Sequence, residues 1–312
     1  MPSYLERYQQ GDYIQVWKVL VAAGDAVRAE PLLRDARAVA NETMRRAKHN
    51  VDLLFVRLKQ LGYDFHEPAT VRVTPSQDDI ADLDQFEQKI GPVPLTLRAW
   101  IENVGMVNFM GSYPRLSIYH SGGHFAEIGS QQPGQPGSQV MSMDEMFADL
   151  NMDDLDNVPG PLPGIIKGMQ KLGLFPKEGE KSEKASDYLP KEPESKATIA
   201  EEDRIESDPL VVEPFIMGES YEHWTDDEEG PHLANIAPDS LHKSAVSGSG
   251  PMEIRLPDAA ADAPLLMTDY GNLTFVEYLR LSFEWAGFPG LQNYARRDDK
   301  LLASLKAGLL PL

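Results

Sequence analysis

The stretch that decides the fold is residues 80–109, which read IADLDQFEQKIGPVPLTLRAWIENVGMVNF. Apolar residues recur every three or four positions on both sides of the Gly-Pro-Val-Pro sequence at 91–94. This spacing predicts two amphipathic helices, the first capped by Ser76 and the second over 95–104. The glycine and prolines at the break end the first helix. We therefore expect a helix–break–helix unit at the centre of the fold.

The chain that precedes this unit is predicted to be helical. Apolar residues at helical spacing run over 13–21 and end near Gly24. A longer pattern of the same kind runs over 32–61, and Gly62 follows it as a stop signal. Residues 1–66 are therefore predicted to be an N-terminal helical segment of two or three packed helices.

Short strand-like runs lie on both sides of the helical unit. The run 71–73 alternates between Pro68 and Pro75. Further runs occur at 116–119, 210–212, 233–236, 252–256 and 265–267. One more helix is predicted over 274–286. Because turns rather than helices join the later strands, we predict an α+β fold, with the N-terminal helical segment followed by a mainly antiparallel sheet flanked by helices.

Residues 129–207 differ in composition from the rest of the chain. They open with GSQQPGQPGS and later contain PKEGEKSEKAS, which cannot bury enough apolar surface to offset the entropy of ordering. We expect a mobile insertion with short helical islands here. The predicted organisation is an N-terminal segment at 1–66 and an α+β domain at 67–312, interrupted at 129–207.

Composition restricts the classes of function. The 312 residues include 49 acidic and 29 basic side chains, for a net charge of -20, and no cysteine. The charge repels phosphate backbones and attracts basic proteins, so we expect a basic protein partner and no nucleic acid. The absence of cysteine excludes disulfides and thiolate chemistry. With no apolar run long enough to cross a bilayer and no signal-peptide pattern, we expect a cytoplasmic protein that does not contact membranes.

Two motifs that resemble metal sites lack the residues such sites need. The acidic stretch 149–156 resembles a calcium loop, but Asp154 and Gly160 stand where the loop requires glycine and a bidentate glutamate. His120 and His124 flank two glycines, which favours a turn over a metal-binding helix. We therefore predict no metal and no cofactor.

Catalytic motifs are also incomplete. The Ser-x-x-Lys spacing at 240–243 occurs by chance in most long chains, its companion motifs are missing, and we read it as a loop. The sequence 247–251, SGSGP, lacks the strand-to-helix context of a phosphate cradle or a nucleophile elbow. Many carboxylates could serve as an acid–base pair, but the sequence selects none of them. We predict no catalytic residues and a chain that is not an enzyme.

One aromatic residue stands outside any core pattern. Trp224 lies in the acidic sequence EHWTDDEEG at 222–230. An aromatic side chain ringed by carboxylates is typical of a hot spot for a basic partner. The candidate partner-contact residues are therefore Trp224, Asp226, Asp227, Glu228 and Glu229. The alternative is that Trp224 is a packing anchor.

The helix–break–helix stretch 80–109 resembles the opening of the SUKH superfamily, whose members include bacterial immunity proteins and cell-wall-assembly regulators. The matching positions are Leu95, Leu97, Arg98, Trp100, Val104, Gly105, Val107 and Phe109. The helix at 273–285 with its following Gly-Phe-Pro-Gly also resembles bacterial members. The resemblance covers 67–128 and 208–292, with Met106 in place of a usual glycine and with the insertion at 129–207 interrupting the sheet.

The resemblance implies a small α+β domain without catalytic residues that binds proteins. It also implies a role as an immunity protein that neutralises a basic toxin domain, typically a nuclease. Two alternatives stay open. One is a regulatory scaffold of the bacterial cytoplasm, in which the N-terminal helices and the sheet domain bind different partners. The other is an acid–base hydrolase.

Overall fold

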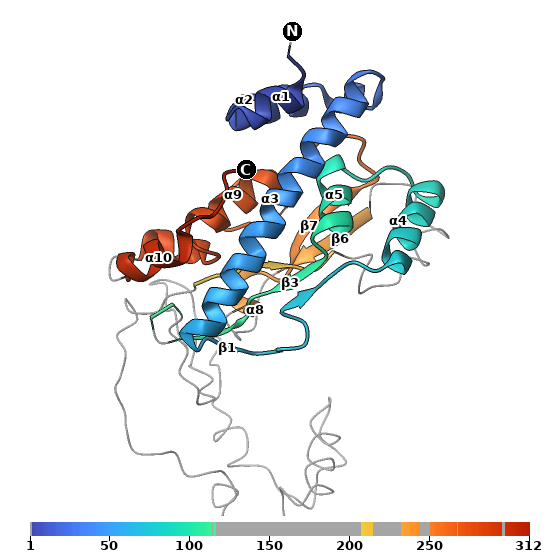
Figure 1. Cartoon of the computed structure of the whole chain (residues 1–312). Helices are drawn as coiled ribbons and strands as arrows, with labels where there is room; N and C mark the ends of the chain where they lie inside the picture. Colours follow the sequence, from blue (N-terminus) through green and yellow to red (C-terminus); the bar gives the residue numbers. More distant parts are fainter. Residues whose placement is uncertain are drawn as a thin grey trace, which may run out of the picture. The chain divides into compact units, whose positions relative to one another are not determined.

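A computed structural model describes residues 2–113, 115–116, 207–214, 232–243, 250–266, 268–294 and 297–312 (Figure 1). All of these residues belong to one compact unit. The expected α+β class is confirmed, because helices precede and flank small antiparallel sheets. Both predicted parts of the chain contribute to this unit, and the boundary near residue 66 stays a prediction. Apart from Ser207, the predicted insertion lies outside the described residues.

The N-terminal helices form where the apolar spacing predicts them, with one addition. The elements are α1 (Tyr4–Gln9), α2 (Tyr13–Ala22), the 3-10 helix η1 (Gly24–Arg28) and α3 (Leu32–Leu61). The short α1 was not predicted, and a capping box between Ser3 and Glu6 starts it. Helix α3 ends at Gly62, which has a left-handed φ of 81°. Helix α3 packs against α1, α5 and α10 (Figure 1).

The helix–break–helix unit is also confirmed. It consists of α4 (Gln77–Lys89) and α5 (Leu95–Asn103), and Ser76 caps α4 in a capping box with Asp79. The backbone N–H groups of Leu95 and Thr96 donate to the carbonyls of Ala260 and Ala261. A distant loop thus satisfies the donors at the start of α5, which has no side-chain cap of its own.

Three small sheets form among the described residues, and every strand pair is antiparallel. The first pairs β1 (Asp64–Phe65) with β4 (Gly111–Ser112). The second has the order β2 (Arg72–Val73), β3 (Met106–Asn108), β5 (Val211–Val212). The third pairs β6 (His232–Ala237) with β7 (Met252–Leu256). Strand β3 precedes the interruption at 129–207, and β5 follows it. Because β5 pairs with β3, it connects the parts of the unit that lie before and after the interruption.

Three sequence predictions differ from the structure within the described residues. The Ser240–Lys243 stretch forms a single helical turn, α8, rather than a loop. Leu116 lies in a turn instead of starting a strand, while residues 117–119 lie outside the described part. The run 265–267 is reduced to an isolated bridge between Leu266 and Glu253, and Met267 is not described. Short apolar runs cannot separate strand from turn without knowledge of the partner strand.

The C-terminal region wraps back onto the N-terminal helices. It contains α9 (Phe275–Glu284), started by a Thr274–Glu277 capping box, the 3-10 helix η7 (Pro289–Asn293) and α10 (Asp299–Lys306). Helix α9 confirms the predicted helix over 274–286, whereas α10 was not predicted. Residues 308–312 then bind along α3.

One hydrophobic core runs through the unit, and its largest side chain, Trp100, lies where α5 meets α9. The fully buried rings of Trp100 and Phe275 pack edge to face, with centroids 5.5 Å apart. The indole N–H of Trp100 donates to the carbonyl of Gly105 at 2.7 Å. Gly105 has a φ of 86°, and a β-carbon there would lie 2.2 Å from the carbonyl oxygen of Val73. Glycine is therefore required at 105, where the chain passes from α5 into β3 in close contact with β2.

None of the helices in the described part of the chain has the length and apolar character that crossing a membrane requires.

Candidate functional site

The partner-contact residues predicted from the sequence, Trp224, Asp226, Asp227, Glu228 and Glu229, lie outside the described residues. The same is true of the acidic stretch 149–156, of the two histidines at 120 and 124, and of the serines at 247 and 249. The predicted role of Trp224 therefore stays a prediction. The candidate site in the described part of the chain comes from other residues.

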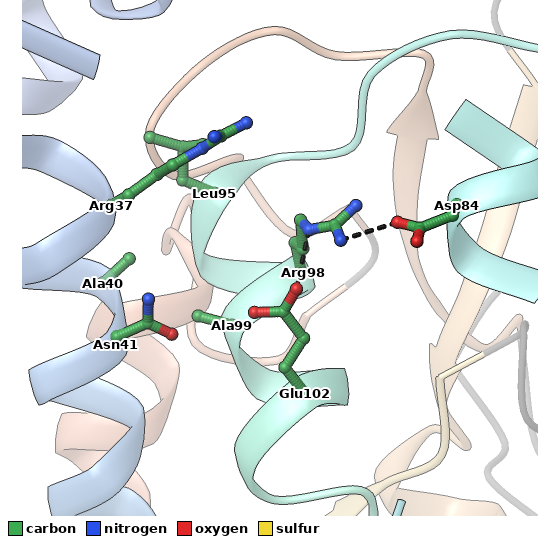
Figure 2. Close-up of a pocket in the computed structure, with 8 residues that line it drawn as sticks. All are labelled: Arg37, Ala40, Asn41, Asp84, Leu95, Arg98, Ala99 and Glu102. Carbon is green, nitrogen blue, oxygen red and sulfur yellow. Dashed lines mark hydrogen bonds and ion pairs between the residues drawn. The ribbon is translucent and has the colours of Figure 1, made fainter. Parts of the chain in front are cut away.

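A hollow of about 350 Å³ opens between α3, α4 and α5 (Figure 2). Its lining is mostly polar and charged, with small or apolar side chains at its base. The residues are Arg37, Ala40 and Asn41 from α3, Asp84 from α4, and Leu95, Arg98, Ala99 and Glu102 from α5.

Arg98 is the centre of this hollow. Its Nε donates to Glu102 at 2.8 Å, its Nη1 to Glu87 at 2.5 Å and its Nη2 to Asp84 at 2.7 Å. The Arg98 side chain is only 20% exposed. Burial alone would lower the pKa of Arg98, but its hydrogen bonds and ion pairs with the three carboxylates raise that pKa above its ordinary value. The guanidinium is thus permanently charged and fixed in one orientation.

Helical spacing places the three carboxylates around Arg98. Arg98 and Glu102 are four residues apart on α5, and Asp84 and Glu87 are three apart on α4, so each pair lies on one helix face. Glu87 also accepts a hydrogen bond from the backbone N–H of Val93 at 3.1 Å. That bond ties the break between the helices to the same cluster. We call Asp84, Glu87 and Glu102 the acidic cluster.

The acidic cluster carries an excess of negative charge. Its three carboxylates face the guanidinium of Arg98, and the hollow is also lined by Arg37, which leaves one negative charge in excess (3 − 2 = 1). On the α3 side, the Asn41 side-chain oxygen accepts from Asn103 Nδ2 at 3.0 Å, and Arg37 is exposed. The hollow is therefore a rigid, polar surface with a fixed pattern of charge.

This arrangement suits binding by charge. The lining of the hollow contains no serine, threonine, histidine or lysine that could act as a nucleophile or a neutral base. Within the described ranges, no group of three or more histidine and acidic side chains is placed to hold a metal ion. Carboxylates held in place by an arginine offer negative charge to a partner.

A second polar cluster is formed by the buried residues Lys243, Asp208 and Tyr278 and the half-buried Tyr270. Lys243 Nζ lies 2.7 Å from Asp208 Oδ1 and donates to Tyr278 Oη at 3.2 Å, while Tyr270 Oη donates to Asp208 Oδ2 at 2.6 Å. Burial alone would lower the pKa of Lys243, but the charge of Asp208 raises it well above its ordinary value. Lys243 is thus held protonated. The hydroxyl of Ser240 bonds to Asp269, so Ser240 and Lys243 do not form a Ser–Lys dyad.

Part of the acidic cluster could have been found from the sequence. The i,i+4 spacing of Arg98 and Glu102 on a predicted helix is a recognisable ion-pair signal. The addition of Asp84 and Glu87 depends on how α4 packs on α5, which the sequence does not specify. The Lys243–Asp208 pair joins residues 35 positions apart and leaves no local signal.

Comparison with family models, curated proteins and solved structures finds no match for this chain. The SUKH resemblance of residues 80–109 therefore stays a proposal.

Proposed function

We propose that the chain is a non-catalytic, SUKH-type protein-binding domain of the cytoplasm that docks a basic partner on the acidic cluster. The partner class is a basic toxin domain, such as a nuclease, which the chain would neutralise as an immunity protein. The observation that carries the proposal is the fixed set of three carboxylates around Arg98, which outnumber by one the two arginines that line the hollow.

A preorganised charge pattern favours association in two ways. The net charge of -20 attracts a basic protein at long range and raises the rate of encounter. The acidic cluster then offers carboxylates whose positions are already fixed by Arg98, so that little side-chain entropy is lost on docking. Specificity in such interfaces comes from matching charge patterns.

The residues that carry the SUKH resemblance support the same proposal. Trp100, Val104, Val107 and Phe109 are all fully buried, so the matching positions form the core that supports the acidic cluster. Leu95 and Arg98 line the hollow itself. A motif whose buried positions shape a charged surface is consistent with a domain used for binding.

The alternative of a regulatory scaffold is favoured by a different observation. Helix α3 of the N-terminal helical segment holds the backbone of residues 308–312 through polar side chains. A helix that binds an extended segment in this way could provide a second binding surface, remote in sequence from the acidic cluster.

Affinity purification from the native cell tests the proposal. The full chain serves as bait and is compared with two double variants of equal charge change. The test variant is Asp84→Asn with Glu102→Gln, and the control is Asp25→Asn with Glu284→Gln, which alters exposed carboxylates on η1 and α9. Glu87 is left intact because it holds the backbone at Val93.

We expect a basic protein to be captured by the unchanged chain and by the control variant, and its recovery to fall about fivefold or more with the test variant. Equal recovery by the test and control variants would show that the acidic cluster is not the docking surface. Capture of a neutral or acidic partner would contradict the proposed partner class.

A further inference from the structure

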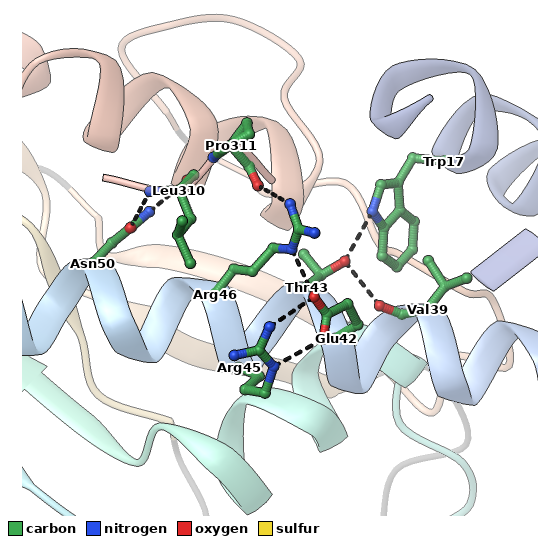
Figure 3. A network of polar contacts seen from close by, with 9 residues as sticks. All are labelled: Trp17, Val39, Glu42, Thr43, Arg45, Arg46, Asn50, Leu310 and Pro311. Carbon is green, nitrogen blue, oxygen red and sulfur yellow. Dashed lines mark hydrogen bonds and ion pairs between the residues drawn. The ribbon is translucent and has the colours of Figure 1, made fainter. Parts of the chain in front are cut away.

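Residues 308–312, Gly-Leu-Leu-Pro-Leu, bind along α3 through their backbone. The side-chain amide of Asn50 donates to the carbonyl of Leu310 at 2.9 Å and accepts from the N–H of Leu310 at 2.7 Å (Figure 3). One asparagine thus satisfies both backbone groups of one residue. Recognition of this kind does not depend on which side chain stands at 310.

Other side chains extend this recognition to the neighbouring residues. Arg46 Nη1 donates to the carbonyl of Pro311 at 3.2 Å, and Arg280 Nε donates to the carbonyl of Leu312 at 2.9 Å. His49 Nε2 lies 3.3 Å from the carbonyl oxygen of Gly308, and that oxygen can only accept a hydrogen bond. Polar groups from α3 and α9 therefore contact the backbone of residues 308, 310, 311 and 312.

The N-terminal helices hold the recognising arginine in position. The Arg46 guanidinium bonds to Glu42 at 2.7 Å (Figure 3). It also lies over the ring of Tyr13, with its centre 4.9 Å from the ring centroid. Burial alone would lower the pKa of Arg46, but its bond to Glu42 helps to raise it, so the charge is retained. The Arg46 guanidinium is therefore held in position by the N-terminal helices, independently of residues 308–312.

The segment itself buries few of its own apolar side chains. Only Leu312 is buried, at 5% exposure, while Leu309 and Leu310 are half-buried and Pro311 is exposed. Asn50, by contrast, is fully buried. A buried amide is costly unless it is paired, so an apolar residue would serve mere packing better at this position. The site is thus well formed on the α3 side, and it holds the segment mainly through backbone groups, which any peptide carries.

We propose that the face of α3 around Asn50 is a binding site for an extended apolar peptide of the Leu-Pro-Leu type, which residues 308–312 fill within the chain and which a partner's segment fills when they leave. The peptide supplies backbone groups to Asn50 and Arg46 and one buried leucine. This site is independent of the acidic cluster and of the proposed basic partner.

Two variants that release the segment by different means test this site. Leu312→Lys places a cation in a buried position beside Arg280, which expels the segment. Gly308 has a φ of 79°, so the backbone is strained when alanine replaces it. The added β-carbon would cause no clash, because the nearest atom lies 3.9 Å away. Far-UV circular dichroism and thermal unfolding of the full-length variants confirm that each remains folded.

The probe is a fluorescein-labelled Gly-Leu-Leu-Pro-Leu peptide with a C-terminal amide, followed by fluorescence anisotropy. We expect it to bind Leu312→Lys at least about tenfold more tightly than the unchanged chain, and Gly308→Ala about fivefold more tightly, because the closed fraction falls. Adding Asn50→Leu to either variant should weaken binding about tenfold, through the loss of two hydrogen bonds.

A peptide with lysine in place of its last leucine serves as the control and should not bind, because its ammonium group would lie beside Arg280. The proposal is overturned if the folded releasing variants bind the probe no better than the unchanged chain. It is equally overturned if Asn50→Leu leaves the affinity unaltered, because the site would then not be the one around Asn50. The binding of the probe and the effect of Asn50→Leu do not depend on whether a basic partner docks on the acidic cluster.

Discussion

Lys243 and Asp208 form an ion pair of 2.7 Å in which both side chains are removed from solvent, with exposures of 0% and 3%. Asp208 lies three residues before β5 and adopts a left-handed φ of 45°. Tyr270 and Tyr278 supply the remaining hydrogen bonds. The pair therefore joins α8 to the start of the second half of the unit.

Replacing one partner of this pair should be strongly destabilising. Lys243→Met leaves the Asp208 carboxylate buried without a counter-charge, and we expect a loss of about 3–5 kcal/mol in the free energy of unfolding, measured by urea denaturation. The double variant with Asp208→Asn removes the orphaned charge and should recover part of that loss. If Lys243→Met is neutral, the pair is not buried as described.

Asp262 predicts a pH dependence of stability. It is fully buried, accepts from Thr96 Oγ at 2.7 Å and from the N–H of Val276 at 3.2 Å, and burial raises its pKa to about 6. Because the folded state binds the proton more tightly than the unfolded state does, this group favours folding at low pH. Its contribution is lost as the pH rises from about 4 to about 6.

Asp262→Asn should remove this effect. The stability difference between the unchanged protein and the variant should shift by about 3 kcal/mol between pH 4 and pH 7, with the variant gaining relative stability at the higher pH. Chemical denaturation at a series of pH values measures this shift. A difference that is flat across the range would show that the Asp262 carboxyl keeps its ordinary pKa in the folded state.

Arg98 should stabilise the folded state, because its charge offsets the repulsion among the carboxylates of the acidic cluster. Arg98→Ala leaves Asp84, Glu87 and Glu102 facing one another, and we expect a loss of about 1 kcal/mol at low salt that shrinks as salt is added. Urea denaturation at roughly 0.05 M and 1 M salt compares the two conditions. A loss that does not change with salt would point to packing of the Arg98 stem instead of charge.

Trp224 provides a test of the contact residues predicted from the sequence. If it is a hot spot for a basic partner, Trp224→Ala should leave the free energy of unfolding unchanged and cost on the order of 2 kcal/mol of binding free energy. Paired denaturation and binding measurements separate the two roles. A variant that unfolds would support the packing alternative for Trp224.

Sequence patterns predicted the elements whose signals are local. The apolar period of α3 with Gly62 behind it, and the cap Ser76 of α4, each lie within a few residues of the element they specify. The pairing of β1 with β4 was missed because two-residue strands are too short to show alternation. Their existence depends on tertiary contacts, such as the bond from Tyr63 Oη to the carbonyl of Phe109.

The candidate site shows the same limit. Arg98 and Glu102 form a local helical pair that spacing alone can indicate, whereas Asp84 and Glu87 join them only through the packing of α4 on α5. Asn50 and Leu310 are 260 positions apart and meet only because α10 directs the chain back along α3. Long-range polar contacts of this kind leave no periodic trace in a sequence.

The salt dependence of binding between the purified full-length chain and the basic partner that it captures tests the central claim most directly. Docking on the acidic cluster predicts an affinity that falls about tenfold or more between roughly 0.05 M and 0.5 M salt, and a smaller fall for the Asp84→Asn, Glu102→Gln variant. The claim that this chain acts through its negative charge would be contradicted if the affinity did not change with salt and if the unchanged chain and the variant had the same affinity at every salt concentration.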